Sequence, residues 1–116
     1  RNAIQNALSE LLERFPDADF LNLTENQKMF VIEQYIALDV YNRFRLDVGK
    51  SVVDKAPNVS AALSRLSQIR DYVREIVSAQ FRLLQTLDQV LTVIQIEKMG
   101  VQALRDAFSV FEEYLQ

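Results

Sequence analysis

An apolar repeat of about 3.5 residues, running from residue 59 to residue 115, constrains the fold of this chain most strongly. Positions spaced alternately three and four apart are apolar throughout, with Gln80 and Glu97 as polar exceptions. A repeat held this long is typical of helices that pack lengthwise against other helices. We therefore predict a packing seam, which also serves for self-association, with these central members: Leu66, Ile69, Val73, Ile76, Leu83, Leu87, Val90 and Ile94.

Capping and helix-breaking residues divide the chain into helices. Two glycines and two prolines leave few sites for tight turns, which argues against a fold of many strands. We predict a first helix over residues 2–15, ended by Pro16. A capping box that begins at Thr24 then starts a second helix over residues 25–55. Pro57 breaks that helix, and Asn58 caps the next one.

The extent of the third helix depends on Gly100. The chain holds no breaker between Asn58 and Met99, so we predict a third helix of this length. Gly100 can end that helix, with residues 101–115 folding back as a fourth, or it can lie inside one continuous helix. The unbroken repeat favours continuity and compactness favours a break; we predict the break.

These lengths predict an all-α helical bundle built on a long antiparallel helical hairpin, which resembles a coiled coil. The turn at Pro57 makes the second and third helices antiparallel, and the short N- and C-terminal helices pack at the opposite end. The turn end should remain a bare two-helix hairpin. We expect residues 1–116 to form one helical domain, excised from a longer protein because the chain starts at Arg1. Without a run of about 20 apolar residues, we expect it to be cytoplasmic.

The composition argues against most catalytic chemistry. The chain has no cysteine and no histidine, which removes thiolate nucleophiles, cysteine zinc sites and the commonest general base. Its carboxylate pairs fall on helix surfaces or in a turn, without a companion motif. No glycine-rich phosphate-binding loop is present. We predict that the protein is not an enzyme and has no catalytic residues, metal ligands or cofactor.

Charge is distributed unevenly along the chain, whose net charge is −3. Residues 1–41 hold three basic and seven acidic side chains, and residues 83–116 hold two and five. Residues 42–82 hold eight basic and four acidic ones. In the predicted hairpin the middle segment surrounds the turn, so we expect a basic tip that binds an anionic partner. Its members are Arg43, Arg45, Lys50, Lys55, Arg65, Arg70 and Arg74.

These observations favour a non-enzymatic protein–protein interaction and oligomerisation module. Its partner is expected to be a second copy of itself, in a homodimer, and an acidic protein at the basic tip. The alternative is a helical module that contacts nucleic-acid phosphates through residues 43–74. A third class, a small-ligand sensor, requires a cavity. Gln80 either fixes the register of the seam or lies at its margin, beside Val77 and Phe81.

Overall fold

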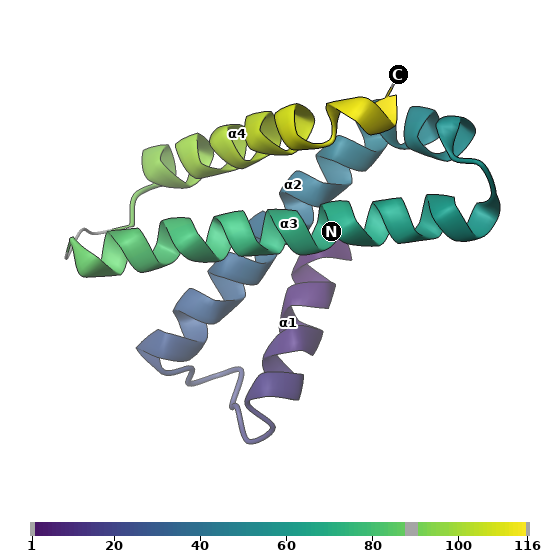
Figure 1. Ribbon diagram of the computed structural model, residues 1–116. Coiled ribbons are helices and arrows are strands. Elements are labelled where there is room, and N and C mark those ends of the chain that lie inside the picture. The colour runs from purple at the N-terminus through teal and green to yellow at the C-terminus, as the bar shows by residue number, and fades with distance from the viewer. Residues whose placement is uncertain (1, 88–90, 116) are drawn as a thin grey trace.

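The computed structural model describes residues 2–87 and 91–115. They form four α-helices and a final short 3₁₀ turn: α1 (Asn2–Arg14), α2 (Glu25–Lys55), α3 (Val59–Thr86), α4 (Val93–Val110) and η1 (Glu112–Leu115) (Figure 1). The predicted all-α class is confirmed. So is the hairpin of two long helices, because α2 and α3 share the most extensive contact in the molecule.

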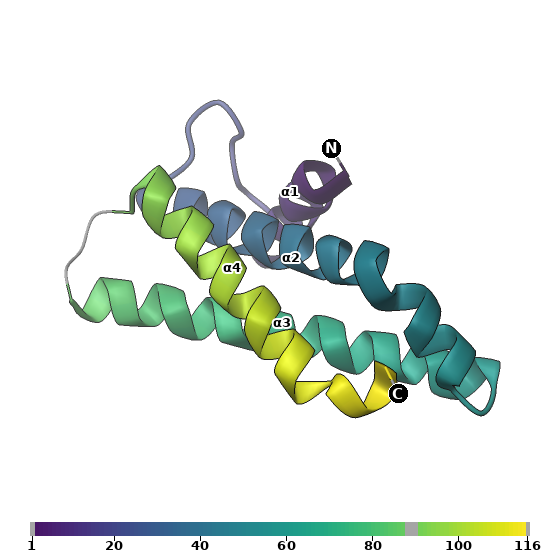
Figure 2. The same ribbon diagram turned by 90° about the horizontal axis from the view of Figure 1, so that it is seen from above.

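The other three helices pack around α2. It runs obliquely behind α3 in Figure 1 and meets it at the turn of residues 56–58. Seen from above, α1 lies on the side of α2 away from α3, whereas α4 lies across α2 and α3 (Figure 2). The molecule measures 47 × 29 × 21 Å. The terminal helices thus pack on the hairpin from different sides.

Local hydrogen bonds explain where the hairpin helices begin. The Thr24 hydroxyl accepts a hydrogen bond from the Gln27 N–H at 3.1 Å, and the Gln27 side chain accepts one from the Thr24 N–H at 3.0 Å. The Asn58 side chain accepts one from the Ala61 N–H at 2.8 Å. Each cap satisfies N–H groups that have no partner within the helix. The predicted capping box and the break at Pro57 are confirmed.

The prediction for the third helix was wrong. The third helix, α3, ends at Thr86 rather than near Met99, and α4 begins at Val93. A second capping box sets this start, because Thr92 and Gln95 exchange hydrogen bonds of 3.0 and 3.1 Å between backbone N–H and side-chain oxygen. The chain does fold back, but before Gly100, which lies inside α4. The cap fixes the start of α4 because it satisfies N–H groups at that point. The apolar repeat does not reveal the break, because such a repeat can continue across a connection between two helices.

The main core lies where α2, α3 and α4 meet. The Phe44 ring on α2 is fully buried and lies 5.0 Å from the Phe108 ring on α4. On α4 the buried side chains include two alanines, which let this helix approach its neighbours closely. Gln80 is half-buried, and Val77 and Phe81 beside it are buried. The Gln80 side-chain oxygen is itself buried, and no donor among the described residues reaches it, so it fixes no register through a hydrogen bond at that atom. The buried residues of α3 and α4 are Ala62, Ile69, Val73, Val77, Phe81, Met99, Ala103 and Ala107.

The C-terminal segment covers part of the turn half of the hairpin. The Tyr114 hydroxyl donates a hydrogen bond to the Gln68 side chain at 2.7 Å. The Phe111 ring meets the Tyr72 ring edge-on at 5.4 Å. The expectation of a bare two-helix hairpin was therefore wrong. The α4 helix runs back along the hairpin and carries η1 toward the turn, as both views show (Figures 1 and 2).

Candidate interaction site at the hairpin turn

Four of the seven residues of the predicted basic tip make ionic or cation–π contacts with other residues of the same chain. Arg43 pairs with Asp39 on its own helix at 3.2 Å, and Arg70 lies 3.9 Å from Asp71. The Arg65 guanidinium lies 4.5 Å above the centre of the Tyr114 ring, a cation–π contact. The fourth, Arg74, reaches Glu10 on α1.

Arg74 lies away from the turn and holds α1 against the hairpin. Its guanidinium donates a 2.9 Å hydrogen bond to Glu10, and both side chains are one-third exposed. A cation held in this way by a carboxylate is not free for an external anion. The structure therefore does not gather the seven basic residues into one patch.

The three remaining basic residues are exposed around the turn. Arg45, Lys50 and Lys55 all belong to the second half of α2. Among the described residues, no carboxylate lies within ion-pair distance of these three. They are the members of the predicted basic tip that keep an unpaired charge.

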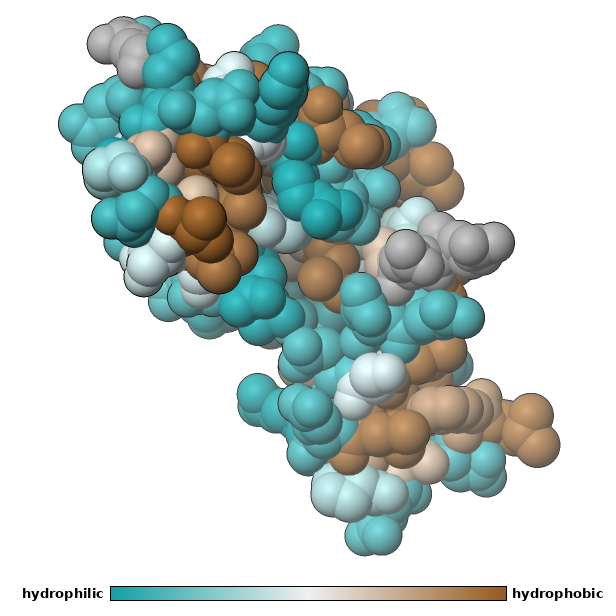
Figure 3. Space-filling model, turned by 90° about the vertical axis from the view of Figure 1, so that its right-hand side faces the viewer, coloured by the Kyte–Doolittle hydropathy of each residue, from teal (hydrophilic) through white to brown (hydrophobic). Residues whose placement is uncertain are grey.

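Large apolar side chains are exposed beside these cations. Val59 and Leu63, in the first two turns of α3, are 76% and 64% exposed, and Val53 on α2 is 47% exposed. Figure 3 looks onto this end of the molecule and shows apolar patches set among hydrophilic surface. Val59 begins the apolar repeat, and the repeat alone does not indicate that this position faces solvent. We refer to Val53, Val59 and Leu63 with Arg45, Lys50 and Lys55 as the turn surface.

The predicted packing seam divides into a buried half and an exposed end. Ile69 and Val73 are fully buried, and Leu66 and Ile76 pack partly buried against the core. Leu83, Leu87 and Ile94 are exposed, because α3 ends and α4 turns back between them. Val90 lies outside the described residues.

An apolar depression lies on α2 between α1 and α4. It has a volume of about 270 Å³ and an entirely apolar lining of Ile4, Ala7, Val31, Ile32, Tyr35, Ile36 and Ile96. A neighbouring depression of about 320 Å³ shares Tyr35, Ile36 and Ile96 with it and adds the charged residues Asp39, Arg43 and Glu97. The two depressions therefore adjoin one another on α2.

In the part of the chain that the structure describes, no three carboxylates come together as a metal site would require. Burial raises the pKa of the Tyr72 hydroxyl above its usual value, and the charge of Asp106 adds to that effect. Within the described ranges, no helix combines the length and apolarity needed to cross a membrane.

The described residues form an all-α protein of four helices, with exposed apolar and basic side chains at its turn end. A family model described as Qat anti-phage system associated protein QatB matches residues 1–111. The chain therefore belongs to the QatB family of the Qat anti-phage system. Comparison with curated proteins and with solved structures finds no match.

Proposed function

We propose that this protein is a non-enzymatic assembly module of the Qat anti-phage system that binds another Qat protein through the turn surface. The observation that carries the proposal is the exposure of Val59 and Leu63 beside cations that have no carboxylate partner among the described residues. An exposed apolar patch rimmed by polar groups is typical of a protein–protein contact.

The charge of the turn surface indicates what its partner carries. Arg45, Lys50 and Lys55 favour a partner with carboxylates around an apolar centre. Asp47 and Asp54 are exposed and alternate with these cations along α2, so the positive charges are separate points rather than the continuous stripe that a row of phosphates would need. An acidic protein surface therefore fits better than nucleic acid.

Co-expression with each of the other Qat proteins tests the proposal. We expect one of them to co-purify with the chain. The double variant Val59→Asp, Leu63→Asp should weaken that complex at least tenfold in calorimetric titration, because it places charge in the apolar centre of the contact. Both side chains are exposed, so the variant should keep the thermal midpoint of the parent protein to within a few degrees.

Leu21→Asp is the matched control. Leu21 is 96% exposed in the connection between α1 and α2, far from the turn, so this variant should bind normally. The proposal is wrong if no Qat protein co-purifies, or if the turn variant and the control bind equally well. Binding to duplex DNA instead, falling steeply with salt, would support the nucleic-acid alternative.

Self-association remains a second proposal for the exposed end of the packing seam. Leu83, Leu87 and Ile94 are large, exposed and close to the connection between α3 and α4. Light scattering at tens of micromolar should give a dimer, and Leu83→Glu with Leu87→Glu should give a monomer. A monomeric parent protein would contradict this proposal without affecting the turn surface.

A further inference from the structure

A polar cleft lies at the end of the hairpin opposite the turn. Its volume is about 610 Å³, within the usual range for small-molecule sites. It is formed by the end of α1, the start of α2 and the end of α3.

Two arginines from distant parts of the sequence line this cleft. Arg14 ends α1 and Arg82 lies in the last two turns of α3. No carboxylate of the described chain lies within ion-pair distance of either guanidinium. Two guanidinium groups without a carboxylate partner favour an anionic ligand on this cleft, and phosphate matches their donor geometry. The ring contacts of Arg14 involve the face of its guanidinium, so the N–H donors at the edge can still reach a phosphate.

Aromatic rings accompany the cations. The Arg14 guanidinium lies 5.9 Å from the Phe15 ring centre and 5.6 Å from that of Phe30. The two rings meet edge-on at 5.8 Å, which fixes their relative orientation. A planar heterocycle can stack on a phenylalanine face or on a guanidinium plane. The cleft therefore offers a stacking surface next to its positive charge.

The polar lining suits the rest of such a ligand. Asn26, Gln34 and Gln85 supply carboxamides, which donate and accept hydrogen bonds as base edges do. Among the described lining residues Glu33 is the one carboxylate, and Ser78 donates a 2.7 Å hydrogen bond to one of its oxygens. Its other oxygen can accept from a sugar hydroxyl, a contact that carboxylates make with ribose in nucleotide sites.

We propose that this cleft binds a nucleoside phosphate, with Arg14 and Arg82 on the phosphate and the Phe15–Phe30 pair beside the base. The site lies at the other end of the molecule from the turn surface, so either assignment can fail without the other.

Calorimetric titration of the purified chain with ATP, GTP, CTP and UTP at 0.15 M salt tests the proposal. At least one should bind with Kd below 1 mM. The variants Arg14→Gln and Arg82→Gln should each weaken it at least tenfold, whereas Arg45→Gln, an exposed arginine on the turn surface, should not. Melting curves check that all three variants fold.

Inorganic phosphate and the matching nucleoside are the remaining probes. Both should bind at least tenfold more weakly than the nucleotide, because each lacks half of the recognised groups. The proposal is overturned if no nucleotide binds, if phosphate alone binds equally well, or if Arg45→Gln weakens binding as much as Arg82→Gln does.

Discussion

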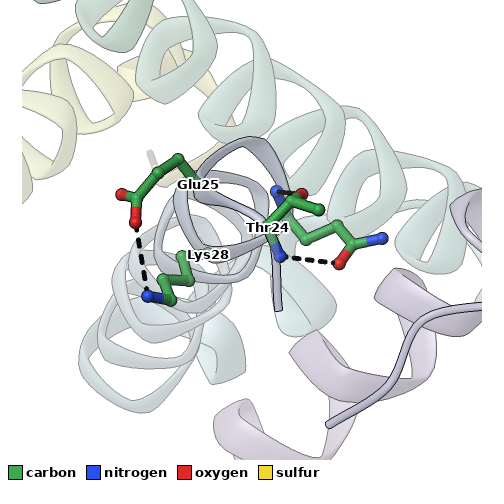
Figure 4. A network of polar contacts seen from close by, with 4 residues as sticks. Thr24, Glu25 and Lys28 are labelled. Atoms are coloured by element: carbon green, nitrogen blue, oxygen red, sulfur yellow. Dashed lines mark hydrogen bonds and ion pairs between the residues drawn. The ribbon is translucent and has the colours of Figure 1, made fainter. Parts of the chain in front are cut away.

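At the residue scale, two threonines begin helices by the same pair of hydrogen bonds. Figure 4 shows the first: the Thr24 hydroxyl accepts from the Gln27 N–H, and the Gln27 side chain accepts from the Thr24 N–H. The Glu25–Lys28 pair beside it, at 3.3 Å, is largely exposed and contributes little. Thr92 repeats the arrangement with Gln95 at the start of α4.

We expect Thr92→Ala to lower the free energy of unfolding by about 1 kcal/mol, because the variant loses the hydroxyl that accepts from the first turn of α4. Thr92→Ser keeps that oxygen and should cost only a few tenths of a kcal/mol. Urea denaturation followed by circular dichroism gives both values. Equal stability of the two variants would show that the cap does not contribute.

Gly100→Ala should stabilise the protein by about 1 kcal/mol, because glycine is the poorer residue inside a helix. A methyl group at Gly100 would meet Val40 at 3.8 Å, an ordinary contact distance. Gly49→Ala is the comparison, since a methyl there would come within 2.9 Å of the Arg45 side chain. Urea midpoints should rise for Gly100→Ala and rise less, or fall, for Gly49→Ala.

The raised pKa of Tyr72 predicts that the stability of the folded protein changes at alkaline pH. Burial and Asp106 raise its pKa in the folded protein, while the unfolded chain keeps a value near 10. Above about pH 10 the folded state therefore holds more protons than the unfolded state, and stability falls as pH rises. Tyr72→Phe cannot ionise and should lose less stability between pH 9 and pH 11. A stability difference from the parent that stays constant over this range would contradict the assignment.

At the scale of elements, the attachment of α1 combines apolar and ionic contacts. Ala3 and Ala7 pack with Leu38 of α2 in a small cluster that is separate from the main core. The Glu10–Arg74 pair ties the same helix to α3. The Arg74 Nε is buried, and no acceptor among the described residues reaches it. That unpaired N–H offsets part of what the ion pair contributes.

A double-mutant cycle with Glu10→Gln and Arg74→Gln should give a coupling energy of about 1 kcal/mol, since a partly buried pair is screened less than a surface pair. The control is Asp39–Arg43, an exposed pair on one helix, which should give only a few tenths. Chemical denaturation of each single and double variant supplies the numbers. Similar coupling in the two pairs would show that burial adds nothing to the first.

At the scale of the whole molecule, α2, α3 and α4 share one core whereas α1 has only a minor one. Phe44, Phe81 and Ile69 are almost completely buried in the main core. Among the described residues, the buried side chains of α1 are those of Ala3, Ala7 and Leu11, of which only Leu11 is large. Alanine buries little apolar area, so the contact contributes less per residue than the main core does.

We therefore expect α1 to open without unfolding the rest of the protein. Native-state hydrogen exchange should give its amides a lower opening free energy than those of α2 and α3. Leu11 is fully buried, so Leu11→Ala should lower the protection of α1 further and leave the α3 amides nearly unchanged. Equal protection across all four helices would instead indicate one cooperative unit.

Much of the fold could be predicted because local signals agreed with one another. Thr24, Pro57 and Asn58 act through hydrogen bonds and sterics within a few residues, and all three boundaries they predict are present. The candidate sites were predicted less well. Arg14 and Arg82 come together only through the packing of three helices, and Arg74 is neutralised by a helix that lies 64 residues away in the chain.

The sequence by itself determined that this chain is helical, that two helices form its long hairpin, and where that hairpin turns. These properties depend on apolar periodicity and on capping, which act over a few neighbouring residues. Only the tertiary structure decided which cations stay unpaired, which apolar side chains face solvent and where a polar cleft opens. Those outcomes depend on the distances between helices, and a linear pattern of residue types does not contain these distances.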